Sequence, residues 1–485
     1  MLEHVLGAGG EEQRHDGPVQ LLKVDEPRGR RLIATTVLGS GMGFLDGTIA
    51  NVALPHIGDD LHASFAELQW VINGYTLTLA SLILVGGSLG DRFGRKRVYA
   101  WGIAGFAIAS ALAALSPTVG ILIAARAIQG VFAALMTPGS LAMLQASFDE
   151  DDRMRAIGAW TGTLGIATAA GPALGGWLVG IDWRIAFWIN LPIAGIVLLL
   201  LRTAPESRDQ DASHKLDLPA MVLTPAALGC LTWSLTEWPS RGATASTLIP
   251  LAVSVVCVIA FLVVERDSAN PLVPLDLFRS RNFSVINIVT LFVYAALSGL
   301  LLFLSLFLQV TAGWSALAAG AATVPLSVVM FFLASRFGAL SSKIGVKRPM
   351  LVGQASVAVG LSLLAVSPEH PNYLLDILPG VLVMGLGLSM MVAPLTGAVL
   401  AAAPERYAGL ASGINNAVSR TAGLLAVAGL PLLVGLAGTE YRSATAVGSA
   451  YRESLFWCSG GAALAFLITA LGVVSRPQRG LVESA

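Results

Sequence analysis

Two charged side chains lie inside apolar runs of the sequence, where a charge is most unusual. Asp46 lies within the run that begins at Leu32, and Arg126 lies in the run that begins at Val119. An ionised carboxylate at the centre of a bilayer costs roughly 2.5–3.5 kcal/mol on insertion scales, so it tends to take up a proton or to pair with a cation. We therefore predict that Asp46 carries a proton and that Arg126 controls its ionisation. Two plainer alternatives stay open: a structural acid hydrogen-bonded to a neighbouring helix, and a fixed cation that binds helix-end carbonyls.

Polar and aromatic side chains at mid-depth in these and other apolar runs are candidates for the lining of a substrate cavity. Gln129 follows Arg126 by three residues, so both would share one face of a helix. Asn51 suits a hydrogen bond between helices somewhat better than a ligand contact, and Trp70 and Tyr75 could equally lie at the membrane–water interface. The candidates are Asn51, Trp70, Asn73, Tyr75, Gln129, Tyr294, Gln309, Gln354 and Asn415.

Arg420 is a further basic residue inside an apolar run, near the cytoplasmic third of the predicted span 407–435. Two interpretations of it have equal support. It could balance Asp46 across a central cleft, or its long side chain could extend towards the cytoplasmic surface.

The composition explains why these residues must be read in a membrane setting. The chain is 55% hydrophobic and 12% charged, with a mean hydropathy of +0.73, whereas soluble domains have about 25% charged residues. This indicates a polytopic membrane protein in contact with a lipid bilayer. The net charge is zero, so nothing suggests a nucleic-acid partner. The three cysteines are far apart, and no nucleotide-binding or nucleophile motif occurs, so we expect no metal, no cofactor and no enzyme activity.

Apolar runs of roughly 20 residues mark the expected membrane spans. They predict an all-α protein with fourteen transmembrane helices. The expected spans are 32–55, 67–88, 98–115, 119–145, 156–180, 185–202, 217–237, 247–264, 284–309, 315–336, 349–366, 374–401, 407–435 and 453–475.

The placement of lysine and arginine predicts the orientation, because cytoplasmic loops carry an excess of these residues. If both termini are cytoplasmic, most basic residues fall inside, and the outer loops hold only Arg184, Arg241, Arg442 and Arg452. We therefore expect a multi-pass protein of the plasma (inner) membrane with both termini in the cytoplasm. The expected organisation is a tail at 1–30, a six-helix bundle at 31–203, an inserted two-helix segment with linkers at 204–282, a second six-helix bundle at 283–475 and a tail at 476–485.

The loop after the second span supports a division into two repeated halves. Gly87–Arg97 combines glycines with one acid and four bases, and Gly338–Arg348 repeats its pattern after the tenth span. The position of Asp91 is occupied by Ser342 in the second copy. Repeated halves with a cleft between them are common in secondary transporters. We predict that the first loop is a conformational latch formed by Gly87, Asp91, Arg92, Gly94 and Arg95.

Several motifs, taken together and in order, resemble the fourteen-span drug:proton antiporters of the major facilitator superfamily. Gly87–Arg97 is similar to the loop between spans two and three of that family, and Leu45–Pro55 to its first-span signature. Arg126-Ala-Ile-Gln129-Gly130 resembles the fourth-span motif, and Trp183–Pro192 also fits. The fifth-span antiporter motif is matched by Gly171, Pro172, Gly175 and Gly176, with Ala167 where the family has a further glycine.

The resemblance implies the major facilitator fold, with an inserted helix pair between two six-helix bundles. It implies proton-coupled efflux of small lipophilic or cationic compounds by alternating-access antiport, in which Arg126 takes part in proton coupling. The expected partners are a small-molecule substrate, protons and lipid, and we expect a monomer. Alternatives are a dedicated exporter of one endogenous metabolite, an uptake symporter, which the Gly171–Pro172 motif disfavours, and a non-transporting membrane scaffold or sensor.

Overall fold

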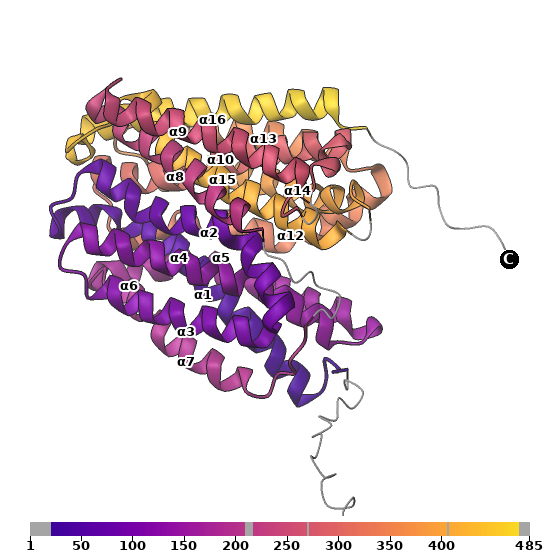
Figure 1. Cartoon of the computed structure of the whole chain (residues 1–485). Coiled ribbons are helices and arrows are strands. Elements are labelled where there is room, and N and C mark those ends of the chain that lie inside the picture. Colours follow the sequence, from indigo (N-terminus) through magenta and orange to yellow (C-terminus); the bar gives the residue numbers. More distant parts are fainter. Residues whose placement is uncertain (1–20, 209–216, 269–270, 405–406, 475–485) are drawn as a thin grey trace, which may run out of the picture.

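The computed structural model describes residues 21–208, 217–268, 271–404 and 407–474, and most of them belong to helices (Figure 1). The apolar sequence explains this, because a backbone in lipid must satisfy its own hydrogen bonds, and a helix does so within one segment. Within the described residues, the β-type pairing is limited to an isolated bridge between Leu22 and Phe148. The predicted all-α class is confirmed. The predicted tail residues 1–20 and 476–485 lie outside the described residues.

Polar caps and a glycine set the helix boundaries of the first half. Ser64 and Glu67 form a reciprocal capping box, and Thr118 and Asp149 each accept a hydrogen bond from the first turn of the next helix. Gly94 has a φ of +103°, which lets the chain turn sharply between two helices. The helices are α1 (Pro27–Asp60), α2 (Phe65–Phe93), α3 (Arg95–Ala114), α4 (Val119–Ser147), α5 (Glu150–Ile181), α6 (Ile185–Trp188) and α7 (Asn190–Leu201).

The inserted pair and the second half follow the same principles. α10 continues into a π-helical turn, η2 (Phe307–Thr311), and a similar turn, η3 (Tyr373–Ile377), precedes α14. Short 3₁₀ turns, η1 (Leu275–Arg279) and η5 (Glu440–Arg442), precede α10 and α16. The helices are α8 (Leu218–Arg241), α9 (Ala245–Asp267), α10 (Arg281–Leu306), α11 (Ala316–Ala321), α12 (Val324–Ile344), α13 (Lys347–Ala365), α14 (Leu378–Ala401), α15 (Ala408–Val434) and α16 (Ala444–Gly472).

Twelve helices in the described residues are long and apolar enough to cross a membrane, so the predicted count of fourteen is not supported. The predicted spans 156–180 and 185–202 are the two that fall short. α5 is a continuous helix of 32 residues, and the apolar segment found within its described part is Ala170–Ile181. The next apolar segment, Ile185–Leu201, is shorter than the usual span of about 20 residues. It is also broken, because α7 begins at Asn190 after the single turn of α6.

Contacts between helix termini define two ends of the molecule. At the end where α1 begins, here called the proximal end, the Leu22 N–H donates to the Ser147 carbonyl at the finish of α4 (2.8 Å). At the distal end, Asp60 at the finish of α1 pairs with Arg184, which follows α5 (2.6 Å). α5 therefore runs the full length of α1. The chain then returns to the proximal end, where the ammonium of Lys96 donates to the carbonyl of Ala204 just after α7 (2.7 Å).

The first and second halves lie against each other, with α8 and α9 packed on the outside. Figure 1 shows the first half in indigo to magenta and the second half in orange to yellow. α8 contacts α2 of the first half, α15 of the second half and its partner α9. Only 11% of the most apolar window of α9 is buried within the protein, so its surface is suited to lipid. The inserted pair thus covers the boundary between the halves from the membrane side.

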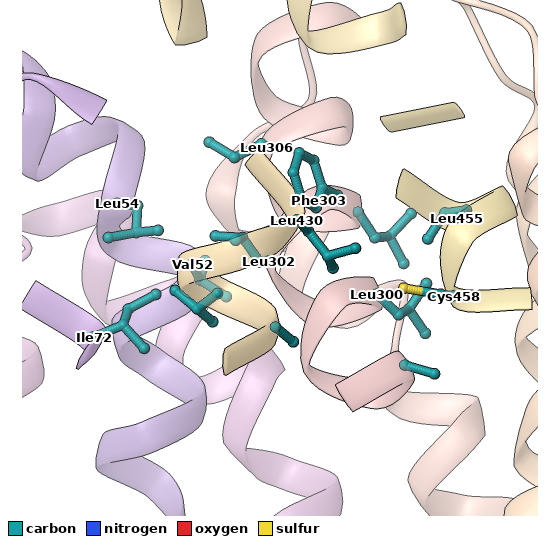
Figure 2. Close-up of a cluster of buried hydrophobic side chains, with 14 of the residues drawn as sticks. Val52, Leu54, Ile72, Leu300, Leu302, Phe303, Leu306, Leu430, Leu455 and Cys458 are labelled. Carbon is teal, nitrogen blue, oxygen red and sulfur yellow. The ribbon is translucent and has the colours of Figure 1, made fainter. Parts of the chain in front are cut away.

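Hydrophobic side chains of both halves share a core, to which the first half contributes residues near the distal end (Figure 2). Direct hydrogen bonds also join the halves there. The Tyr441 hydroxyl donates to the Ala63 carbonyl (2.9 Å), and the Phe65 N–H donates to the Gly438 carbonyl (2.8 Å). These contacts close the distal end. The core side chains labelled in Figure 2 are Val52, Leu54, Ile72, Leu300, Leu302, Phe303, Leu306, Leu430, Leu455 and Cys458.

Candidate functional site

The candidate site is centred on an ion pair between Asp46 of α1 and Arg126 of α4. Nη1 of Arg126 donates to Oδ2 of Asp46, and both side chains are about 1% exposed. Gln129, one turn after Arg126, connects the two charges. Its amide oxygen accepts a hydrogen bond from Arg126 (2.6 Å), and its amide nitrogen donates to Oδ1 of Asp46 (2.8 Å). The structure therefore brings together three residues that the sequence singled out.

Ser110 of α3 and Asn190 of α7 complete the polar cluster, and neither was among the predicted site residues. Nδ2 of Asn190 donates to Oδ1 of Asp46 and to the Ser110 hydroxyl, both at 3.2 Å. The amide of Gln129 also donates to the Ser110 hydroxyl (2.8 Å). Asn190 belongs to the Trp183–Pro192 motif and could have been found there, whereas Ser110 has no local sequence signal. Four helices thus contribute polar atoms to one enclosed network.

Aromatic rings and a backbone carbonyl hold the remaining faces of the Arg126 guanidinium. Nε donates to the carbonyl of Val71 in α2 (3.1 Å). The guanidinium carbon lies 4.4 Å from the centre of the Tyr75 ring and 5.6 Å from that of Phe187. Such cation–π contacts contribute about 2 kcal/mol or more when water is excluded. Tyr75 therefore contacts the ion pair directly, rather than lying at the membrane–water interface.

The two buried charges of the ion pair depend on each other. A buried ion pair has no net charge, but removing one partner typically costs 3–5 kcal/mol because the other charge remains buried alone. Protonation of Asp46 likewise leaves the charge of Arg126 buried without a counter-charge. A proton on Asp46 must therefore be accompanied by a rearrangement that gives Arg126 a new partner or access to water. The arrangement can couple protonation to a change of conformation.

Asn51 and Gln309 lie on the boundary between the halves, nearer the distal end. The Ser305 hydroxyl donates to the Asn51 carbonyl (3.2 Å), and the Gln309 amide donates to the Val52 carbonyl (3.1 Å). The amide of Asn51 donates to Gly47 of its own helix (3.0 Å). A cavity of about 20 Å³, the size of a water molecule, is lined by Thr48, Asn51, Val52, Pro172, Leu301, Ser305, Ala319, Gly320 and Thr323.

Trp70 and Asn73 form no contact with the ion pair among those that the described residues show. The indole of Trp70 lies 5.9 Å from that of Trp233, so it packs against the inserted helix α8. Asn73 is fully buried, and neither its amide oxygen nor its nitrogen has a hydrogen-bond partner in the structure. Trp70 therefore belongs to the contact of α2 with α8.

Asn415, Tyr294 and Arg420 form a second polar region on α10 and α15. The Asn415 amide donates to Asn287 (3.0 Å) and Thr290 (2.8 Å), which ties α15 to α10. The side chain of Gln354 is buried elsewhere and bonds to Thr469 (2.8 Å), so it does not line this region. Arg420 does not pair with Asp46, whose oxygens bind residues of the first half.

The proposed latch residues lie at the proximal end. Asp91 pairs with Arg95 one turn later (2.7 Å), and the guanidinium of Arg92 lies over the Phe93 ring (4.9 Å). Glu206, in the segment after α7, accepts a hydrogen bond from the Lys96 N–H at the start of α3 (2.9 Å). A Cβ on Gly94 would lie 2.7 Å from the Glu206 carboxyl carbon, whereas one on Gly87 would make ordinary contacts.

The glycines of the fifth-span motif hold α5 against helices of both halves. A Cβ on Gly171 or Gly175 would lie 2.8 Å or 2.7 Å from side chains of α1. A Cβ on Gly176 would lie 2.3 Å from the Ala316 carbonyl of α11, and one on Gly320 would lie 2.0 Å from the Pro172 carbonyl. The backbones of α5 and α11 can approach so closely only because both positions are glycine.

A bundle of apolar helices in two halves, with a buried ion pair and a close glycine contact between halves, defines a polytopic membrane transporter. Residues 36–427 match the Major Facilitator Superfamily, and the chain belongs to that family. The sequence-based recognition of this superfamily is therefore confirmed, as is the expectation of a transporter rather than an enzyme.

Several relatives are named as resistance or export proteins. The chain is 35% identical over 411 residues to the tetracenomycin C resistance and export protein of Streptomyces glaucescens, covering 83% of this chain and 75% of that protein. It is 36% identical over 389 residues to the multidrug resistance protein Stp of Mycobacterium tuberculosis, covering 80% and 72%. It is 34% identical over 421 residues to the methylenomycin A resistance protein of Bacillus subtilis, covering 86% and 90%.

Solved structures agree on the fold. The POT family transporter PepTSo superposes with a TM-score of 0.67 at 15% identity, covering 91% of this chain and 97% of that one. A bacterial homologue of the lysosomal transporter Spinster, described as inward-facing and unoccupied, gives a TM-score of 0.64 at 17% identity, covering 92% and 97%. At these identities the likeness concerns the fold alone.

Proposed function

We propose that this protein exports small lipophilic compounds in exchange for protons, with Asp46 as the proton-carrying group. The observation that carries the proposal is the ion pair of Asp46 with Arg126, enclosed within the first half and connected by Gln129. The resistance and export functions named for the relatives support the direction of transport. The absence of a nucleotide-binding motif from the sequence favours an ion gradient as the energy source.

The mechanism is alternating access between the two halves. In the described conformation the distal end is closed by the contact of Tyr441 with Ala63. Opening of that end exposes Asp46 to external protons, and its protonation frees Arg126 and releases the substrate outwards. Closing of the distal end then returns the proton to the cytoplasm. The close contact between Gly176 and Ala316 lies at the boundary that must move, and it favours a rocking motion about that point.

The orientation with both termini in the cytoplasm is part of this proposal. α5 runs from the proximal to the distal end, and the segment through α6 and α7 returns, as the contacts of Asp60 and Lys96 require. If both segments cross the membrane in addition to the twelve longer helices, each half has six crossings and α8 and α9 add two. The Arg281 side chain at the start of α10 donates to Leu471 at the finish of α16 (2.7 Å). This contact is consistent with both termini leaving at the proximal face.

The experiment is transport by purified protein in proteoliposomes with an imposed pH gradient. A panel of lipophilic dyes is tested for accumulation and for the proton movement that accompanies it. The wild-type protein should exchange at least one dye for protons, and Asp46→Asn should abolish both fluxes. Dye transport whose rate is independent of the pH gradient would contradict proton coupling.

A dedicated exporter of one metabolite is the second candidate, because two of the relatives are named for a single antibiotic. A toxicity screen in a deletion strain separates the two. A multidrug exporter protects against several unrelated compounds, whereas a dedicated exporter protects against one compound and its close analogues.

A further inference from the structure

Arg420 lies near the middle of α15 and carries a charge that no neighbouring carboxylate balances. Within the described parts of the chain, no acidic side chain forms an ion pair with it. Asp46 is already bonded to Arg126, Gln129 and Asn190. The first half therefore contains a balanced ion pair, and the second half contains an unbalanced cation at a similar depth.

The surroundings of Arg420 leave part of its hydrogen-bonding capacity unused. Its guanidinium carbon lies 5.5 Å from the centre of the Phe44 ring, so the cation faces α1 across the boundary between the halves. Its Nε is buried without a hydrogen-bond partner. Tyr75 and Tyr294 are both close enough to interact with it electrostatically. A guanidinium has five N–H donors and no acceptor, so the missing partner must be an acceptor.

The space in front of Arg420 is open on the α1 side. Phe44 is 39% exposed although it lies in the middle of its helix. A Cβ on Gly47, one turn later on the same face, would have no atom within 4 Å. The carboxylate of Asp46 points to the opposite face of α1, into the first half. A molecule between the halves would therefore meet Arg420 and Phe44, and not the ion pair.

The side chains of this region favour a ligand that carries a negative charge next to an aromatic ring. A half-buried arginine such as Arg420 can bind a carboxylate or phenolate through charge-assisted hydrogen bonds, often two at once. The rings of Phe44 and Tyr294 offer edges and faces to an aromatic system. A cationic ligand would instead be repelled by Arg420, and the described residues offer it no unpaired carboxylate at that depth.

We infer that Arg420 binds the acidic group of the transported molecule, and that the preferred substrates are aromatic acids. This rests on the proposed export function and narrows its substrate class. It differs from the sequence-based expectation of lipophilic or cationic substrates, because the charge that lacks a partner is positive.

Equilibrium binding to the purified full-length protein tests the inference without requiring proton coupling. Three probes share one ring system and differ in charge: naphthalene-1-carboxylate, naphthalene-1-carboxamide and 1-naphthylmethylamine. Calorimetry is done in phosphatidylcholine nanodiscs, which excludes an anionic lipid headgroup as the partner of Arg420. The variants are Arg420→Gln, Arg420→Lys and, as a matched control, Arg452→Gln, whose side chain is exposed on α16.

The wild-type protein should bind the carboxylate about tenfold or more tightly than the carboxamide, and the amine weakest. Arg420→Gln should remove the preference while leaving carboxamide affinity within about twofold, Arg420→Lys should keep part of it, and Arg452→Gln should keep all of it. Tenfold corresponds to about 1.4 kcal/mol, close to the lower limit of about 1.5 kcal/mol for a hydrogen bond to a charged group. Absence of the preference in the wild type, or its survival in Arg420→Gln, overturns the inference. An intact preference without gradient-driven transport contradicts only the proposed function.

Discussion

Replacing Asp46 by Asn separates the structural role of the ion pair from its role in transport. In the variant, the amide oxygen can still accept the hydrogen bonds from Gln129 and Asn190. The amide nitrogen, however, is a donor, and it faces the N–H donors of Arg126, so no hydrogen bond forms between them. Arg126 then remains buried without a counter-charge, which costs roughly 3–5 kcal/mol of folding free energy. Its contacts with the Val71 carbonyl and the Tyr75 ring offset part of this loss. We expect lower stability and no proton-driven transport.

The double variant Asp46→Asn/Arg126→Gln distinguishes these two effects. It leaves no buried charge, and replacing a whole buried pair by neutral groups is often close to neutral in stability. We expect most of the stability to return while transport stays absent. Unfolding is followed by denaturant titration in detergent, and transport by proton flux in proteoliposomes. The control Asp276→Asn changes a side chain that is 81% exposed, and it should alter stability by less than about 0.5 kcal/mol.

Two results would refute this reasoning. If Asp46→Asn were as stable as the wild type, the ion pair would not make the contribution to folding free energy that is assigned to it. If either the single or the double variant still exchanged dye for protons, Asp46 would not be the proton-carrying group.

Three further changes test other parts of the structure. Gly320→Ala places a Cβ 2.0 Å from the Pro172 carbonyl, so overpacking should destabilise the protein by about 1–3 kcal/mol and impair transport, as measured by unfolding and flux. Tyr441→Phe removes the hydrogen bond to Ala63, which should weaken distal closure by about 0.5–1.5 kcal/mol and increase labelling of a cysteine placed in the distal region. Asp91→Asn should slow transport without lowering substrate affinity if the proximal loop is a latch.

Each of these three predictions has a control or a result that would contradict it. Gly195→Ala adds a Cβ with no atom within 4 Å and should be tolerated. An unchanged labelling rate in Tyr441→Phe would mean that the hydrogen bond does not hold the distal end closed. Unchanged transport rates in Asp91→Asn would rule out the latch.

The charged members of the site could be predicted from sequence, but its neutral members could not. Asp46 and Arg126 stand out because a charge in an apolar run is energetically costly, and Gln129 follows from helical spacing. Ser110 is not distinctive in the same way, since serines are common in such helices. Its role depends on where α3 meets α4 and α7, and no local pattern fixes that contact.

The rotation of each helix also limited the sequence-based reading. Trp70 and Tyr75 lie five residues apart on α2, yet one packs against α8 and the other against Arg126. Hydropathy gives the depth of a residue and not its direction, so the predicted cavity lining combined residues from several faces. The structure supports twelve of the fourteen predicted spans. The other two spans were predicted from the length of the apolar runs alone, which does not show that the segment of α6 and α7 is broken.

The enclosure of Asp46 and Arg126 within one half has an electrical consequence. Because the two charges move together, the membrane potential does no net work on the pair when the halves rock. Once Asp46 takes up a proton, the first half carries one uncompensated positive charge. Moving one such charge across the whole membrane potential changes the free energy by about 2.3 kcal/mol per 100 mV. With a negative cell interior, the potential favours inward movement of the first half when Asp46 is protonated, but does no work on that half when the ion pair is intact. In this scheme the ion pair makes the transporter sensitive to voltage in the one step that imports a proton.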